Sequence, residues 1–186
     1  MRLFALSLLV GVMATVAACS RQSPPKATLP TGAIVDLAHD YSDQTIFWPT
    51  AEGFRLDKVA DGMTDKGYYY AANNYSGAEH GGTNERGAAA VPKLHFPGLH
   101  PGAARWLAET RRISAVGLDT ASIDYGQSTL FEAHRALYEH NVPAFENLTN
   151  LDRLPPRGAV VIALPMKIKG GSGAPLRAVA ILPPTQ

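Results

Sequence analysis

The sequence predicts a single domain of the α/β class, and two patterns support this prediction. The first half of the chain is mostly strand-like: residues 33–37 form a short apolar run, and residues 54–60 and 68–75 have the alternation of paired strands, with a turn expected at Asp61 and Gly62. In the second half, helical and strand-like patterns alternate. This alternation is typical of a domain in which helices pack against a sheet.

The elements expected in the second half are short. Helical periodicity is found at residues 102–112 and 129–140, the first of which ends in two arginines that suit a helix C-terminus. Apolar runs bounded by glycine, proline or polar residues predict four strands, at residues 113–118, 142–145, 159–165 and 176–182.

The first 18 residues have the composition of a secretory signal peptide. Arg2 gives a positive start, and residues 3–18 are uncharged but shorter than the about 20 apolar residues that span a membrane. The run ends in Val-Ala-Ala-Cys at Cys19, which resembles the bacterial lipobox. We therefore expect cleavage before Cys19, lipidation of its thiol and export to the cell envelope, on the periplasmic side of the outer membrane. The alternative is an ordinary signal peptide with an incidental cysteine.

The mature chain divides into a tether and one domain. Residues 19–31 are polar and proline-rich, which is typical of a flexible linker, and residues 32–186 are long enough for one domain. Cys19 is the only cysteine, so a lipidated chain has no disulfide. Seventeen Lys and Arg residues against 16 Asp and Glu residues give no basic surface for nucleic acid.

Three side chains are candidate metal ligands. His80 lies in the loop sequence Glu-His-Gly-Gly-Thr, where glycines allow close backbone packing, although a lone loop histidine is more often without function. His134 lies near the start of a helix of roughly 9 Å, and the strand that follows returns roughly 13 Å to Glu146. If this strand packs back along the helix, Glu146 arrives beside His134. The alternative is that His134 pairs with a neighbouring carboxylate and Glu146 is a surface charge.

Two histidines and one carboxylate are the ligand types of a catalytic metal site. Such a set with an open coordination position suits zinc, and the same ligand types also suit manganese. The sequence therefore predicts a divalent-metal site, with zinc as the first choice, at His80, His134 and Glu146.

The chain as a whole resembles the cyclase family of metal-dependent hydrolases, whose best-known activity is kynurenine formamidase (arylformamidase). The resemblance follows ordered segments over most of the mature chain: residues 35–39 with Trp48 and Pro49, 79–83, 94–98, 104–107, 115–120, His134, 146–150, 163–168 and 170–173. It implies a swivelling β/β/α domain, a small-molecule substrate and, as in many family members, a homo-oligomer.

The chain departs from the family pattern after Thr83. The family motif HxGTHxDxP continues with a second His, an Asp, a Pro and a further His, whereas this chain has Asn84, Glu85, Arg86 and Gly87. An internal deletion between two Gly-Thr pairs would explain this junction and the shortness of the chain. The domain is therefore expected to be a truncated form of the family fold.

The resemblance implies an enzyme that hydrolyses a C–N bond other than a peptide bond. Its reference reaction is the conversion of N-formylkynurenine to kynurenine in tryptophan catabolism, and hydrolysis of a related amide or ester is the other option. Trp48 would offer an aromatic wall to the substrate. The resemblance assigns no catalytic residue that survives in this chain. The alternative is a non-catalytic, lipid-anchored remnant or binding module of the same fold.

Overall fold

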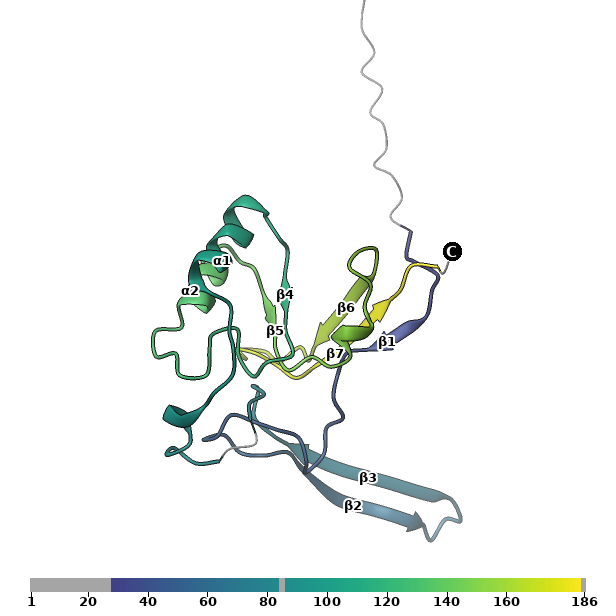
Figure 1. Ribbon diagram of the computed structural model, residues 1–186. Coiled ribbons are helices and arrows are strands. Elements are labelled where there is room, and N and C mark those ends of the chain that lie inside the picture. Colours follow the sequence, from purple (N-terminus) through teal and green to yellow (C-terminus); the bar gives the residue numbers. More distant parts are fainter. Residues whose placement is uncertain (1–27, 84–85, 185–186) are drawn as a thin grey trace, which may run out of the picture.

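The computed structural model describes residues 28–83 and 86–184, and the elements of this part form three β units and a pair of helices. The units are a three-stranded sheet, a parallel two-stranded pair and a long hairpin. In Figure 1 the parallel pair stands between the helices and the three-stranded sheet, and the hairpin extends away from the other elements. The α/β class expected from the sequence is confirmed.

The three-stranded sheet has the order β1-β7-β6 and is antiparallel throughout. Its strands are β1 (Ile34–Asp36), β6 (Val160–Pro165) and β7 (Leu176–Ile181). The central strand β7 buries its two inward-facing alanines completely. These alanines, Ala178 and Ala180, pack in a cluster with Val35 of β1, with Leu37 directly after β1, and with Leu148 of the segment after β5. This cluster joins the sheet to the segment that carries Glu146.

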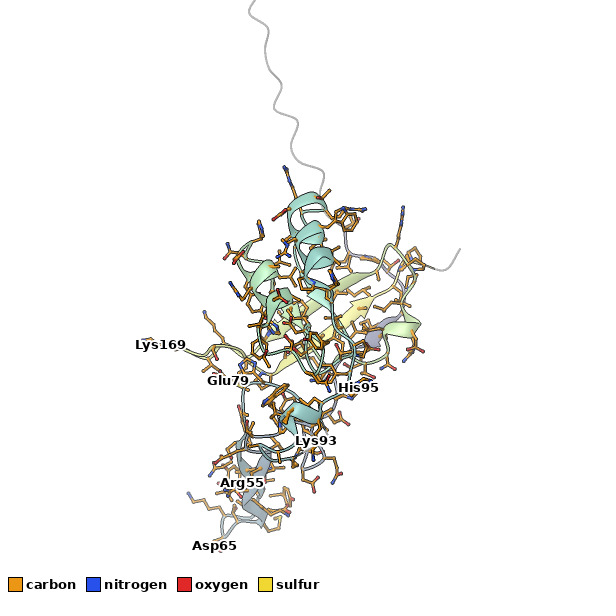
Figure 2. The ribbon with its side chains drawn as sticks, turned by 60° about the vertical axis from the view of Figure 1, so that its left-hand side comes forward. Arg55, Asp65, Glu79, Lys93, His95 and Lys169 are labelled. Carbon is orange, nitrogen blue, oxygen red and sulfur yellow. The ribbon has the colours of Figure 1, made fainter. Side chains whose placement is uncertain are left out.

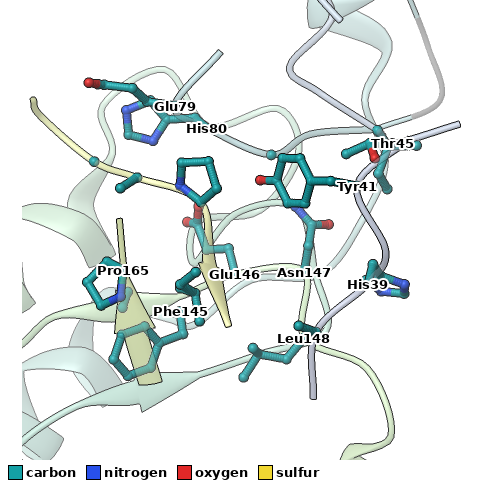
Figure 3. Close-up of a pocket in the computed structure, with 18 of the residues that line it drawn as sticks. His39, Tyr41, Thr45, Glu79, His80, Phe145, Glu146, Asn147, Leu148 and Pro165 are labelled. Carbon is teal, nitrogen blue, oxygen red and sulfur yellow. The ribbon is translucent and has the colours of Figure 1, made fainter. Parts of the chain in front are cut away.

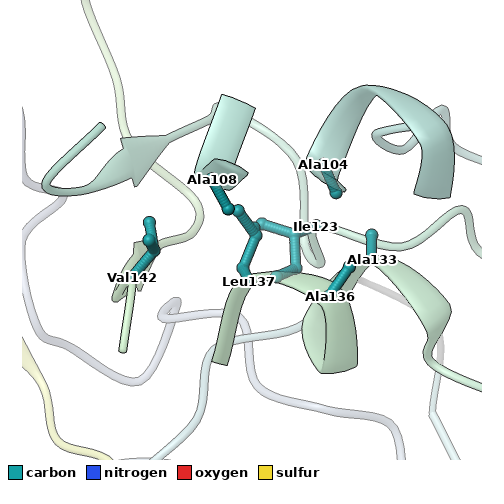
Figure 4. Close-up of a cluster of buried hydrophobic side chains, with 7 residues drawn as sticks. All are labelled: Ala104, Ala108, Ile123, Ala133, Ala136, Leu137 and Val142. Atoms are coloured by element: carbon teal, nitrogen blue, oxygen red, sulfur yellow. The ribbon is translucent and has the colours of Figure 1, made fainter. Parts of the chain in front are cut away.

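The helices pack on the parallel pair. Helix α1 (Pro101–Arg105) begins with a proline at its first turn and continues into the π-helical turn η2 (Trp106–Thr110). Helix α2 (Glu132–Tyr138) precedes β5 (Ala144–Phe145), which pairs in parallel with β4 (Val116–Gly117). Figure 4 shows the buried side chains that hold these elements together: Ala104, Ala108, Ile123, Ala133, Ala136, Leu137 and Val142.

The hairpin consists of β2 (Arg55–Met63) and β3 (Tyr69–Ser76). The turn expected at Asp61 and Gly62 is wrong, because these residues continue β2 and pair with β3. The chain turns further on, where Thr64 N–H donates to the carbonyl of Tyr68 at 2.8 Å and Gly67 adopts a φ of 80°. Figure 2 shows Asp65 at the far tip of the hairpin and Glu79 near its base.

Several predicted elements are shorter in the structure. The helix expected from residue 129 begins at Glu132, because Phe131 before it has a left-handed φ of 49°. The strands expected at 113–118 and 142–145 are each reduced to the two residues of β4 and β5. Two short 3-10 helices complete the described elements, η1 (Val91–Lys93) and η3 (Leu151–Arg153).

Some sequence predictions concern residues outside the described part. The signal peptide, Cys19, the tether up to residue 27, and Asn84 and Glu85 at the predicted junction belong there. Within the described ranges, no helix combines the length and apolar character needed to cross a bilayer.

Candidate active site

A cleft of about 860 Å³ opens where the carboxyl end of β1, the end of β5 and the loop before β7 meet. Its walls are largely apolar and include Leu37, Phe145 and Leu176. Figure 3 shows Glu79 and His80 at one end, His39 at the other, and Glu146 with Asn147 between them. A mostly apolar cleft with a few polar groups is the usual form of a small-molecule site.

His134 and Glu146 lie side by side, as the length of the helix and the returning strand predicted. His134 is in the first turn of α2, and Glu146 directly follows β5. The imidazole Nε2 of His134 is 3.4 Å from Glu146 Oε1, and each side chain is 23% exposed. The same Glu146 oxygen accepts a hydrogen bond of 2.9 Å from the backbone N–H of Ile123, which fixes its position.

Asp124 holds the other side of the His134 ring. Its Oδ2 lies 2.5 Å from His134 Nδ1, and since an ionised carboxylate can only accept, Nδ1 is the donor. The two Asp124 oxygens also accept from the backbone N–H groups of Ala133 and His134, at 2.9 and 3.2 Å, in the first turn of α2. Asp124 is only 3% exposed. It therefore fixes the ring and leaves Nε2 facing Glu146.

Sequence reasoning did not single out Asp124. The available signal was a carboxylate directly after the apolar Ile123 and shortly before a helix that begins with a candidate histidine. Carboxylates near a helix N-terminus commonly accept from its free N–H groups. His134 thus contacts both the neighbouring carboxylate Asp124, as the alternative expected, and Glu146.

The two carboxylates change the proton affinity of the site. Burial alone lowers the pKa of His134, but hydrogen bonds and charges from Glu146 and Asp124 outweigh burial and raise the pKa above its ordinary value. Burial raises the pKa of Tyr138, and the charges of Glu146 and Asp124 raise it further. The Tyr138 ring stands edge-on to the His134 ring, with centroids 5.4 Å apart. The neutral phenol of Tyr138 thus encloses the pair on one side.

His80 has different neighbours. Its Nε2 is 3.5 Å from Ser172 Oγ, and the Ser172 hydroxyl donates to Glu79 Oε2 at 2.7 Å. The Ser172 backbone N–H donates to the same Glu79 oxygen at 3.2 Å, and the hydroxyl and N–H together lower the pKa of Glu79. His80 is exposed, and its ring packs directly over Gly173, where a Cβ would come within 2.5 Å of His80 Cε1. His80, in the segment after β3, thus lines the same cleft and packs against the loop before β7.

The glycines after His80 allow close backbone packing, and in the structure they pack against the backbone of Phe47 and Trp48. A Cβ on Gly82 would lie 2.1 Å from the carbonyl carbon of Phe47, and Gly81 forms a bridge with Phe47. With its amide oriented to satisfy both groups, Asn147 donates to the Gly82 carbonyl and accepts from the Gly82 N–H, each at 3.3 Å. Asn147 thereby links the His80 segment to the segment of Glu146.

The pair formed by His134 and Glu146 fits a metal ion in kind and spacing. Bonds of about 2.0–2.2 Å at a tetrahedral angle place two ligand atoms about 3.3–3.5 Å apart, and Nε2 and Oε1 are 3.4 Å apart. The complete set does not assemble: across residues 28–83 and 86–184, no three or more His, Cys, Asp or Glu side chains are grouped to hold a metal ion. His80 as the third ligand therefore stays a prediction.

Trp48 lies outside the cleft lining, so its role as an aromatic wall also stays a prediction. The aromatic side chains that do line the cleft are Tyr41, Tyr138 and Phe145. Burial raises the pKa of Tyr41, and its ring stands edge-on to that of Phe47 with centroids 6.1 Å apart. Sequence reasoning missed these aromatics because they come from three separate segments.

Comparisons with known proteins identify similar sequences. A family model described as "Putative cyclase" matches residues 84–125. The isatin hydrolase of Roseibium aggregatum is 39% identical over 93 residues, which cover 48% of this chain and 35% of that protein. The kynurenine formamidase of Salinibacter ruber is 45% identical over 67 residues, covering 36% of this chain and 31% of that protein. The chain thus matches about a third of the length of these relatives.

The fold has solved counterparts. Isatin hydrolase A from Ralstonia solanacearum superposes with a TM-score of 0.67 at 22% identity, covering 81% of this chain and 92% of that chain. A protein from Bacillus stearothermophilus described as a predicted metal-dependent hydrolase gives a TM-score of 0.57 at 17% identity, over 80% of this chain and 97% of that one. These likenesses confirm the expected fold, and together with the sequence matches they confirm the resemblance to the cyclase family.

Proposed function

We propose that this relative of the cyclase family is a hydrolase that acts on the carbonyl of an amide or ester. N-formylkynurenine, which would be cleaved at a C–N bond other than a peptide bond, is the reference substrate. The observation that supports this proposal is the pair of His134 Nε2 and Glu146 Oε1, which are 3.4 Å apart. Glu146 lines the cleft, and the buried Asp124 holds the other side of the His134 ring. The named relatives, an isatin hydrolase and kynurenine formamidases, are also hydrolases.

The residues of the chain supply binding and proton control. The apolar cleft walls bind the organic part of the substrate and reduce the water around the reacting carbonyl. Asp124 keeps a proton on His134 Nδ1, so Nε2 is the ring atom available to a ligand or to Glu146. A divalent metal, zinc or manganese, would polarise the carbonyl and acidify a water molecule when bound. The two donors fit such an ion, while no third donor among the described residues converges with them.

An internal deletion after Thr83 accounts for the missing donors, and we include it in the proposal. Two findings support it. The family-model match begins at residue 84, directly after Thr83. The stretch shared with the Roseibium aggregatum protein covers 48% of this chain but only 35% of the relative, which is therefore the longer protein. A chain that lost the segment between these points would keep His80 but lose the ligands that follow it in the family motif.

The second candidate function is a non-catalytic binding module of the same fold. It is favoured by the absence of a group of three metal-binding side chains within the described ranges. Such a module would still bind an organic ligand in the 860 Å³ cleft. Hydrolysis separates the two candidates, because only the first requires His134 and Glu146 for chemistry.

The experiment is an assay of the full chain with N-formylkynurenine and added zinc or manganese, beside the Salinibacter ruber formamidase. We expect slow hydrolysis, about 10²-fold or more below the reference, because general acid–base help alone commonly contributes about 10²–10⁴-fold and the metal would also be poorly positioned. His134→Gln and Glu146→Gln should abolish it. Glu139→Gln, on the exposed end of α2, should not.

The outcomes divide the candidates clearly. Ligand binding without any hydrolysis would select the binding module. A rate equal to that of the reference, abolished by His80→Ala, would show that the chain retains a complete metal centre. Hydrolysis that survives both His134→Gln and Glu146→Gln would contradict the proposed site.

We also propose that the protein is exported and anchored through lipid on Cys19, which the lipobox-like sequence supports. The lipid on Cys19 would then be the protein's contact with the membrane. We further propose that the domain assembles as a homo-oligomer. Cys19→Ala should leave the chain unprocessed or release it from the membrane fraction. Unchanged fractionation and unchanged mass would contradict the anchor.

A further inference from the structure

A second, apolar groove of about 720 Å³ runs between the base of the hairpin and the end of β6. One wall is formed by Leu164, Met166 and Ile168, which alternate along β6 and the segment after it. These three side chains are 67%, 42% and 42% exposed. Large apolar side chains that are exposed together in a concave site commonly mark a place where a ligand or partner binds.

The opposite wall is a row of aromatic rings. Tyr41 stands edge-on to Phe54 with ring centroids 5.7 Å apart, and Phe54 stacks on Tyr75 with centroids 6.3 Å apart. The Tyr75 hydroxyl reaches across to the sulfur of Met166 at 3.8 Å. This contact ties the hairpin to the segment directly after β6. The groove is therefore a space with two defined walls.

The groove continues into the cleft that holds Glu146. Both spaces are lined by the same segments, residues 38–41 of the loop after β1 and Glu79, Pro175 and Leu176. The two spaces thus share one continuous lining, with the exposed apolar side chains of Leu164, Met166 and Ile168 in the groove, and His80 and Glu146 in the cleft. This is the arrangement expected for a substrate with an apolar tail and a polar reacting group.

We propose that the groove is a subsite for the apolar tail of an amphipathic amide or ester whose carbonyl lies in the neighbouring cleft. The inference rests on the proposed hydrolase function and adds a substrate class to it. A small-molecule tail is favoured over a protein surface because the groove is concave and its aromatic wall is fixed by stacking, whereas protein partners commonly cover flatter patches. The tail is aliphatic or aromatic, and it packs between Met166 and the ring of Phe54.

The test is binding of N-phenyl-1-naphthylamine, a neutral apolar fluorophore, to the full chain. We expect Met166→Asp to weaken binding about tenfold or more, because it places a carboxylate against the apolar ligand. Met63→Asp is the matched control. Met63 is 69% exposed on the hairpin, outside the groove, and its substitution should change binding less than twofold. Met166→Leu keeps the apolar wall and should retain binding within twofold.

Hydrolysis of 4-nitrophenyl esters from acetate to octanoate provides a second readout. With a tail subsite, kcat/KM should rise up to about fourfold per added methylene in the unmodified chain, and this rise should be lost in Met166→Asp. Tail-dependent binding without hydrolysis of any ester would support the subsite and contradict the hydrolase function. Hydrolysis that is indifferent to Met166 would support the function and overturn the subsite.

Equal probe binding by Met166→Asp and Met63→Asp would overturn the inference. If Met166→Asp also lowered the mass of the protein in sedimentation, the face would be covered by a second copy of the chain instead. Probe binding that all variants share reports other apolar parts of the chain, so only the difference between the two aspartate variants counts.

Discussion

Asp124, His134 and Glu146 form the best-defined group of interactions in the site. Each has a fixed neighbour: Asp124 accepts three hydrogen bonds from the start of α2, and Glu146 accepts one from Ile123 N–H. The imidazole between the carboxylates is thereby held with Nε2 toward Glu146, which lines the cleft. In metal sites a carboxylate behind the histidine commonly fixes the ring in this way. The role of Asp124 at this scale is to position His134.

Replacing Asp124 tests this role. Asp124→Asn removes a charge from behind the His134 ring and weakens the hydrogen bonds at the start of α2. We expect a loss of about 1–3 kcal/mol in the free energy of unfolding and a lower pKa for His134. Urea denaturation and NMR titration of the imidazole measure the two effects. Unchanged values for both would show that the contact has no such role, and Asp119→Asn, in the segment after β4, is the control.

The raised pKa of His134 also predicts how stability depends on pH. The folded chain holds this proton more tightly than the unfolded chain, in which histidine titrates near pH 6.5. The stabilisation is therefore complete below about pH 6.5 and is lost as the pH rises through the folded pKa. In a chelator, denaturation from pH 5.5 to 8.5 should show this decline.

Comparing variants isolates the contribution of His134 to this dependence of stability on pH. His134→Gln should flatten the decline, whereas His39→Gln, on the cleft rim, should leave it in place. A decline of the same size in His134→Gln would assign it to other titrating groups. Because a metal ion binds only the deprotonated imidazole, metal affinity should change in the opposite direction and rise with pH.

At the scale of elements, the sequence predicts the long strands well and the short ones poorly. Strands β6 and β7 lie within the predicted ranges, because their apolar runs are bounded by proline and glycine. Strands β4 and β5 keep only two paired residues each, since their length depends on where two distant segments meet. The hairpin turns after Met63 rather than at Asp61, because Asp61 pairs within the hairpin and its carboxylate contacts Lys58 and Tyr69.

The approach of residues 81–82 to Phe47 is an element contact that only glycine permits. In Gly82→Ala the new Cβ would meet the backbone of Phe47 and Trp48 at 2.1 Å, so the bridge must open. We expect a loss of about 1–3 kcal/mol in stability and a displaced His80 segment. Gly62→Ala, with no atom within 4 Å of its Cβ, should stay within about 0.5 kcal/mol. Equal thermal denaturation of both variants would contradict this reading.

At the scale of the whole molecule, only part of the site could be predicted from the sequence. The approach of Glu146 to His134 follows from the lengths of α2 and β5, which are neighbours in the chain. The position of His80 depends on how a distant loop meets the Gly-rich segment at Ser172, and no local pattern encodes that contact. The proposed deletion after Thr83 would add a further difficulty, because the resemblance to the family's metal motif ends there.

The proposed function requires that His134 and Glu146 form half of a metal site. Its most direct test is calorimetric titration of the full, metal-stripped chain with zinc and manganese. We expect at most one bound ion per chain, held weakly, with binding lost in both His134→Gln and Glu146→Gln and retained in Glu139→Gln. Tight binding of two ions per chain, or binding of one ion that both His134→Gln and Glu146→Gln leave unchanged, would contradict it.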